Sequence, residues 1–151
     1  MKAATGFSLV EVLVATTIVI VGVASLAHLF VVSADASRLA HSSSMALLAA
    51  QQKLEALRAD AIGLGLSPPG TLGANTPPYV DYLSVDGTSL NATLTLPPVG
   101  TVFVRRWSVE PLSGSSREGV QLQVVVIPWN ASRPNVPGAA HLVSVKARRA
   151  G

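Results

Sequence analysis

Residues 7–34 read FSLVEVLVATTIVIVGVASLAHLFVVSA, and this stretch decides the fold of the 151-residue chain. A helix needs about 20 apolar residues to cross the roughly 30 Å hydrocarbon core of a bilayer. No charge and no proline occur between Val12 and Ala34, so one continuous membrane-spanning helix is predicted. Glu11 is the single charged residue of the stretch. An acid within a membrane span costs free energy and suggests a function, whereas an acid at a helix start is simply stabilised by the helix dipole.

The composition agrees with a chain that lies partly in lipid. Hydrophobic residues make up 49% and charged residues 13% of the chain, against about 25% charged residues in an ordinary soluble domain. This balance excludes a disordered chain. The absence of cysteine excludes a disulfide framework, a thiolate metal site and a cysteine nucleophile. No spacing of Ser, His and acidic residues supports an active site, so we expect no catalytic residue, no metal and no cofactor.

Three interpretations of the amino terminus follow from this pattern. A secretory signal peptide has an apolar core of about 7–15 residues, and the run found here is about twice too long for one. An ordinary single-span anchor suits the length but explains neither Glu11 nor the residues before the run. The third interpretation is a short leader, residues 1–6, that is removed before Phe7.

The third interpretation rests on residues 6–11, GFSLVE, which together with the long apolar run resemble the amino-terminal motif of type IV pilins and type II secretion pseudopilins. The resemblance implies that a prepilin peptidase cuts between Gly6 and Phe7 and then N-methylates Phe7. It also implies that residues 7–34 hold the protein in the lipid of the inner membrane until it joins a helical filament. Glu11 would then face the N-terminal ammonium of a neighbouring subunit, because a buried carboxylate needs a partner.

The helix is predicted to continue beyond the membrane. Residues 35–61 contain no proline or glycine and are rich in helix-forming residues. Glycines and the Pro68-Pro69-Gly70 turn end it shortly afterwards. An apolar stripe at spacings of three and four predicts an amphipathic helix that packs on the carboxy-terminal domain. The stripe consists of Leu47, Ala50, Leu54, Leu57 and Ala61.

Residues 62–151 are predicted to form a β-rich globular domain. Its first part, residues 62–101, is rich in Gly, Pro, Ser, Thr and Asn, and indicates a variable loop region with one or two short strands, at 79–85 and 90–96. Its second part, residues 102–149, indicates an antiparallel meander. The meander has strands at 101–109, 119–129 and 140–149. One face of the sheet would cover the amphipathic helix, giving an α+β, pilin-like fold.

A second resemblance concerns the strands. Residues 103–109, FVRRWSV, followed by VIPW at 126–129, are similar to PilV-type minor pilins and I-type minor pseudopilins. The chain lacks the cysteine pair and the proline within the membrane helix that many major pilins have. The resemblance therefore implies a minor subunit, not an enzyme, that primes assembly or lies at the tip of a pilus or pseudopilus. Its partners would be other minor and major pilins or pseudopilins and the inner-membrane assembly platform, with the carboxy-terminal domain in the periplasm or outside.

The charge is uneven along the chain, which leaves other functions open. Residues 105–151 hold seven basic and two acidic residues, a net charge of +5, whereas residues 7–104 carry −3. Such a dipole could steer head-to-tail assembly. A competence-type pilin would instead use basic residues to bind DNA phosphates, and a solvated strand face would explain the same charges. A membrane-anchored periplasmic enzyme is a third alternative. The candidate DNA or partner contacts are Arg105, Arg106, Lys146, Arg148 and Arg149.

Overall fold

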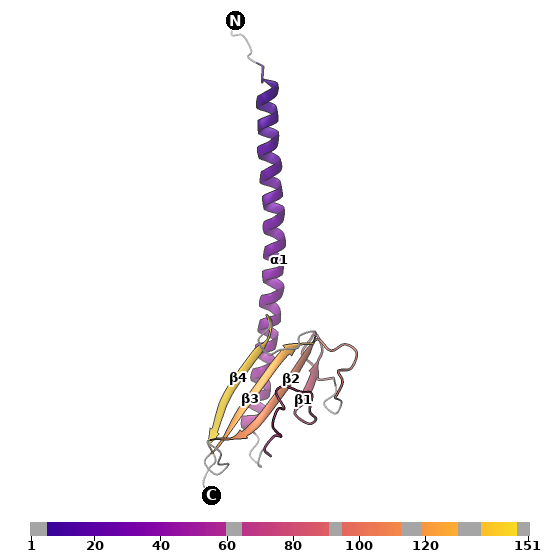
Figure 1. Cartoon of the computed structure of the whole chain (residues 1–151), viewed down its shortest axis with the longest axis vertical. Helices are drawn as coiled ribbons and strands as arrows, with labels where there is room; N and C mark the ends of the chain where they lie inside the picture. Colours follow the sequence, from indigo (N-terminus) through magenta and orange to yellow (C-terminus); the bar gives the residue numbers. More distant parts are fainter. Residues whose placement is uncertain (1–5, 60–64, 91–94, 113–118, 130–136, 148–151) are drawn as a thin grey trace. The chain divides into compact units, whose positions relative to one another are not determined.

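The computed structural model describes residues 6–59, 65–90, 95–112, 119–129 and 137–147. The chain divides into two compact units, residues 1–38 and residues 39–151. The described residues form one long helix followed by four strands, in the order α1, β1, β2, β3 and β4 (Figure 1). The α+β prediction is confirmed in this coarse form: a long amino-terminal helix packs on a small antiparallel sheet.

Helix α1 (Leu9–Ala59) begins two residues later than predicted, because Ser8 caps it. The Ser8 hydroxyl oxygen accepts a hydrogen bond of 3.2 Å from the Glu11 backbone N–H. This bond satisfies one of the backbone donors that every helix start leaves free. The predicted end at residue 61 lies outside the described residues.

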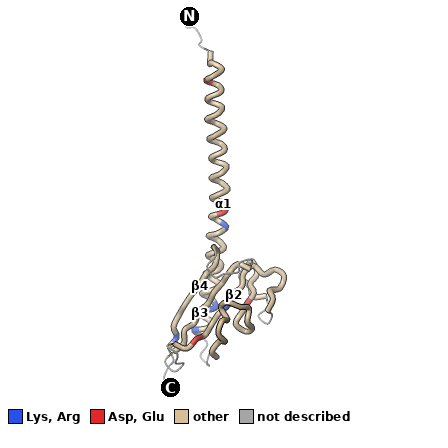
Figure 2. The backbone as a smooth tube through the Cα atoms, in the orientation of Figure 1, with Lys and Arg blue, Asp and Glu red and all other residues tan. Residues whose placement is uncertain are grey.

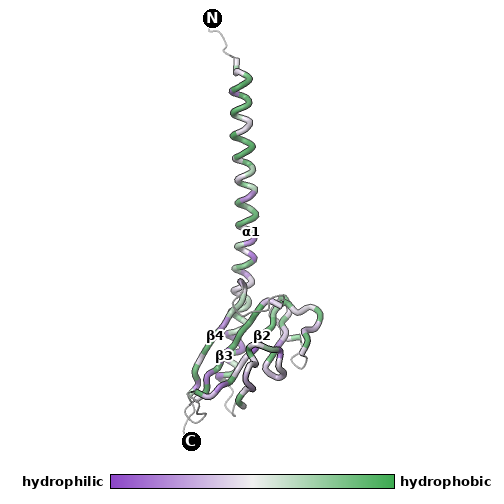
Figure 3. The backbone as a smooth tube through the Cα atoms, viewed as in Figure 1, coloured by the Kyte–Doolittle hydropathy of each residue, from purple (hydrophilic) through white to green (hydrophobic). Residues whose placement is uncertain are grey.

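The part of α1 in the first unit is a candidate membrane span. Its side chains are exposed on all sides of the helix, and apolar residues dominate them (Figure 3). Three of its hydroxyl groups are satisfied within the helix: Thr16, Thr17 and Ser25 each donate to a backbone carbonyl four residues earlier. These three bonds suit a hydrocarbon environment, where every donor must find a partner within the protein.

The part of α1 in the second unit buries a stripe that is close to the predicted one but rotated by one residue at its start. The buried residues are Ala46, Ala50, Leu54 and Leu57, whereas Leu47 remains 42% exposed. The prediction for Leu47 is therefore wrong. The physical reason is that Ala46, Ala50 and Leu54 form one i, i+4 ridge, and the small alanines let the helix backbone approach the sheet. Ala61 lies outside the described residues.

The four strands form one antiparallel sheet in the order β1-β2-β3-β4. The strands are β1 (Val80–Leu83), β2 (Phe103–Pro111), β3 (Gly119–Pro128) and β4 (Ala140–Ala147). The predicted meander is present, with β2 shifted two residues toward the carboxy terminus. The strand predicted at residues 79–85 appears as β1, while residues 91–94 of the other short candidate lie outside the described residues.

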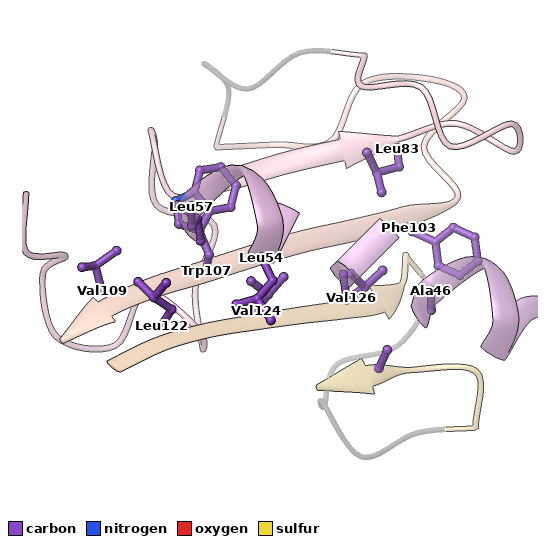
Figure 4. Close-up of a cluster of buried hydrophobic side chains, with 12 residues drawn as sticks. Ala46, Leu54, Leu57, Leu83, Phe103, Trp107, Val109, Leu122, Val124 and Val126 are labelled. Carbon is purple, nitrogen blue, oxygen red and sulfur yellow. The ribbon is translucent and has the colours of Figure 1, made fainter. Parts of the chain in front are cut away.

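Both faces of the sheet are covered over part of its area, while Val143 and Val145 on β4 remain exposed. On one face, Trp107, Val109, Leu122, Val124 and Val126 pack against the buried stripe of α1 (Figure 4). On the other face, a second cluster of buried residues packs with the partly buried Leu72 and Ala139. This explains why β3 is buried without alternation from residue 124 to 127, since strands covered on both faces read as continuous apolar runs. The second cluster consists of Val80, Tyr82, Val104, Val125 and Ile127.

Candidate functional site

The first candidate site is the start of the chain, residues 6–11. Gly6 and Phe7 precede the helix, and both are exposed. A Cβ atom placed on Gly6 would meet no atom of the described residues within 4 Å, and its backbone does not adopt the conformation that favours glycine. The fold of this chain therefore makes no demand for glycine at residue 6. A requirement for glycine there would have to come from a molecule that recognises this segment.

Glu11 lies in the first turn of α1. Its carboxylate makes no hydrogen bond or ion pair with any other residue that the structure describes. In Figure 2 the apolar part of the helix carries a single acidic band, close to its amino-terminal end. The carboxylate is thus the one ionisable group on an otherwise apolar surface near the helix start, where the dipole favours negative charge.

The sequence reasoning missed that Ser8 and Glu11 occupy the positions of a capping box. In this motif a Ser at the N-cap is followed three residues later by Glu or Gln, and the Ser8–Glu11 hydrogen bond is half of it. The signal was present in the spacing Ser-x-x-Glu directly before an apolar run. Glu11 therefore has two separable properties: its charge, and its shape as a capping residue that glutamine would share.

The second constellation is a charged cluster between α1 and the sheet, within the unit of residues 39–151. The Asp81 Oδ2 atom accepts hydrogen bonds from Arg105 Nε at 3.1 Å and from Arg105 Nη2 at 2.7 Å. Lys53 Nζ lies 3.5 Å from the same oxygen and 3.4 Å from the centre of the Trp107 ring, a cation–π contact. Burial lowers the pKa of Lys53 below its ordinary value, against the opposing effect of the Asp81 carboxylate.

Arg105 cannot serve as a DNA contact in this fold, which corrects one of the predicted site residues. Its side chain is 8% exposed, and it also donates to the backbone carbonyl of Ala49 at 3.0 Å. The strand places it on the face that α1 covers. A guanidinium that is already paired with a carboxylate and covered by a helix is not accessible to a phosphate.

The other predicted basic residues do not join Arg105 on one surface. Arg106 lies on the opposite face of β2, where its side chain donates to the Asn75 side-chain oxygen at 2.9 Å and to the Leu72 carbonyl at 3.2 Å. Burial lowers its pKa. Lys146 is half-buried, and its ammonium lies 3.4 Å from the Leu57 carbonyl at the carboxy-terminal end of α1. The two remaining predicted residues, Arg148 and Arg149, lie outside the described residues.

Three basic side chains of the second unit, Arg58, Arg106 and Lys146, instead join segments of this unit to one another. Arg58 donates to the Ser144 hydroxyl through Nε at 3.1 Å and through Nη2 at 2.6 Å, which joins α1 to β4. Lys146 binds a carbonyl of the last helical turn, where cations are favoured by the free carbonyls and by the dipole. Arg106 ties the segment around residues 72–75 to the outer face of the sheet. Each contact is a link between segments far apart in the sequence.

No protein-family model matches the chain, and no curated protein or solved structure shows significant similarity to it. The features that bear on function are therefore those of the chain itself. They are the exposed segment of residues 6–11, the uncharged helix surface that follows it, and the compact unit of residues 39–151.

Proposed function

We propose that the protein is a minor pilin or pseudopilin, a structural subunit of a type IV pilus or a type II secretion pseudopilus. It is made as a single-pass inner-membrane protein with a leader of residues 1–6. A prepilin peptidase removes the leader and methylates Phe7. The subunit then joins other pilins or pseudopilins through the inner-membrane assembly platform, to start a filament or to lie at its tip.

One observation carries this proposal: a lone carboxylate lies in the first turn of α1, four residues after Phe7, and the exposed helix residues 12–34 that follow it carry no charge. When such helices pack into a filament core, the carboxylate leaves water and needs a cationic partner. Cleavage before Phe7 creates a new N-terminal ammonium on every subunit. An ammonium of a neighbouring subunit can therefore neutralise Glu11.

The exposed state of Gly6 also supports the proposal. A protease must bind its substrate in an extended, accessible form, and Gly6 and Phe7 precede the helix and are exposed. Because the fold makes no demand for glycine at this position, the small residue is explained by recognition at the cleavage point.

The proposal is tested with the full chain in cells that make a prepilin peptidase and the partner subunits. Glu11→Ala and Glu11→Gln should both be cleaved and methylated like the wild type, which the mass of the mature amino terminus reports. Both should be depleted from the sheared filament or pseudopilus fraction. Glu11→Gln is the decisive variant, because glutamine keeps the capping-box shape and loses only the charge.

Two controls separate the charge of Glu11 from its place at the helix start. Ser8→Ala removes the cap but keeps the charge, so it should be incorporated more efficiently than Glu11→Gln. Gly6→Val should remain uncleaved. If Glu11→Gln is incorporated as well as the wild type, the proposed ion pair is wrong, and if Gly6→Val is processed normally, the prepilin assignment as a whole is wrong.

A further inference from the structure

One end of the unit formed by residues 39–151 carries exposed apolar side chains that the packing of this unit does not explain. At this end, called here the proximal end, β1 and β3 finish and β2 and β4 begin. It is the end at which α1 enters the unit. A Cβ placed on Gly87 would lie 3.8 Å from the Met45 methyl carbon, and one on Gly138 would lie 2.7 Å from the Ser42 hydroxyl oxygen.

The apolar residues at the proximal end are held in place by the backbone. Trp129 donates its N–H to the Val102 carbonyl at 2.8 Å, and Val102 donates to the Leu83 carbonyl at 2.8 Å. Val99 is fully exposed, Val85 is 73% exposed, and the large Trp129 side chain is half exposed. The proximal end thus presents an indole and several aliphatic side chains to the surroundings.

Charge is nearly absent from the described residues of this end. Within described residues 84–90, 95–102, 128–129 and 137–140, Asp86 is the single charged side chain. The hydroxyls of Ser84 and Thr88 both donate to its carboxylate, and these hydrogen bonds lower the pKa of Asp86. The described part of this surface, which holds no Lys, Arg or Glu, does not fit a nucleic acid or an anionic peptide.

The chain itself tethers the proximal end close to lipid. Asp35 and Arg38 are the first charged residues after the apolar run, and they form an exposed ion pair at 3.9 Å. Charged groups of this kind lie at the level of the lipid headgroups, about 5–7 Å thick on each side of the hydrocarbon core. Ser42 follows Arg38 by four residues, about 6 Å of helix. The surface around Ser42 and Met45 therefore lies within reach of the headgroup layer.

We propose that the proximal end is a membrane-contact surface, which rests on the inner-membrane span of the proposed function but not on filament assembly. Trp129 and Val99 insert into the boundary between headgroups and acyl chains before the subunit is assembled. Tryptophan is enriched at this depth, because its ring is apolar and its N–H remains hydrated. Aliphatic side chains add binding in proportion to the apolar area that leaves water. The contact would hold the globular unit against the membrane surface.

The absence of cysteine makes this surface directly measurable in the full chain. Single cysteines at Val99 and Val85 carry a nitroxide spin label in liposomes of phosphatidylethanolamine and phosphatidylglycerol. Val145→Cys is the control, because Val145 is an exposed valine on β4, opposite Gln121 and toward the other end of the sheet. Val21→Cys reports the membrane span. At low protein density, labels at Val99 and Val85 should collide severalfold less with a water-soluble nickel chelate than the label at Val145.

A measurement on the unlabelled protein provides a second test. Of the two tryptophans, Trp107 is buried and Trp129 is half exposed. Lipids brominated near the headgroup should therefore quench a component of the fluorescence that Trp129→Phe removes. If this component is missing, Trp129 does not contact lipid and the proposal is overturned.

The outcomes separate the possible failures. If Val99 and Val145 labels are equally accessible while the Val21 label reports lipid, the membrane-contact surface is wrong and the span stands. If the Val21 label is accessible to the chelate, the span itself is wrong, and the proposed function fails with it. If Val99 becomes shielded only as protein density in the membrane rises, its partner is another copy of the chain, which also overturns the proposal.

Discussion

Replacing Asp81 by asparagine should lower the free energy of unfolding of the unit formed by residues 39–151 by about 3 kcal/mol. Asp81 is 6% exposed and accepts two hydrogen bonds from Arg105, at 2.7 and 3.1 Å. It is also the anionic neighbour of Lys53, at 3.5 Å. Asparagine keeps the size of the side chain but leaves two cations without a negative charge between α1 and the sheet.

The size of the expected loss follows from the burial of Asp81 and from the contacts that Arg105 and Lys53 keep without it. Removing one partner of a buried ion pair costs about 3–5 kcal/mol, because the other charge stays buried without compensation. The lower figure applies here, since Arg105 keeps its hydrogen bond to the Ala49 carbonyl and Lys53 keeps its contact with Trp107. Small domains have a total stability of about 5–15 kcal/mol, so the loss is a large fraction of the total.

Urea unfolding of the full chain in detergent micelles measures this loss, with tryptophan fluorescence as the signal. The buried Trp107 ring, which contacts Lys53 and Tyr79, reports directly on the region. With a slope of about 1–3 kcal/mol per molar urea, the midpoint should fall by about 1–3 M while the slope stays constant. Glu55→Gln is the control: its ion pair with Arg58 is exposed on α1, and such pairs contribute about 0–1 kcal/mol.

A double-mutant cycle completes the test. Arg105→Met should itself destabilise, but adding it to Asp81→Asn should cost less than the sum, with a coupling of about 0.5–3 kcal/mol. If Asp81→Asn shifts the midpoint no more than Glu55→Gln, the cluster is hydrated like a surface pair. The reasoning from its burial would then be refuted.

Three further predictions concern the same unit. Because burial lowers the pKa of Lys53 in the folded state, the unfolded chain holds its proton to higher pH. The stability of the wild type relative to Lys53→Met should therefore rise as the pH increases toward about 10, the ordinary pKa of lysine. Urea midpoints measured on the alkaline side of neutrality test this, and a flat difference contradicts it. Gly119→Ala places a Cβ 2.9 Å from the Lys146 carbonyl oxygen on β4 and should cost about 1–3 kcal/mol. Gly65→Ala, whose Cβ would meet no atom of the described residues within 4 Å, should be close to neutral. The lowered pKa of Asp86 stabilises the folded state above about pH 4, and this contribution is lost as the pH falls. The urea midpoint of the wild type should therefore fall more steeply below about pH 5 than the urea midpoint of Asp86→Asn.

The local pattern of the sequence was sufficient to predict the elements. The run of residues 7–34 predicts a long exposed apolar helix because a charge-free stretch of this length has no other stable arrangement in or near a bilayer. The β-branched segments that became β2, β3 and β4 predict a meander, since short connections between successive strands favour antiparallel neighbours. The candidate residues Gly6, Phe7 and Glu11 are also visible in sequence, because their relation is one of spacing along the chain.

Contacts between distant segments were decided only by the tertiary structure. Arg105 and Arg106 are neighbours in the chain, yet one lies under α1 against Asp81 and the other lies on the opposite face beside Asn75. Which of the two is buried with a carboxylate depends on the register that pairs Asp81 with Arg105. A shift of one residue would exchange their faces, because side chains alternate along a strand.

The buried stripe of α1 also depends partly on the local sequence and partly on the tertiary structure. Spacing predicts that an apolar stripe exists, but Ala46 and Leu47 both satisfy it, and the sheet selects Ala46 because its small side chain allows closer packing. The sequence by itself therefore determined which segments are helix, strand and membrane-like, because these depend on neighbours within one or two turns. The tertiary structure decided which charges are free and which are bonded, because pairing, register and burial depend on residues that meet only when the chain has folded.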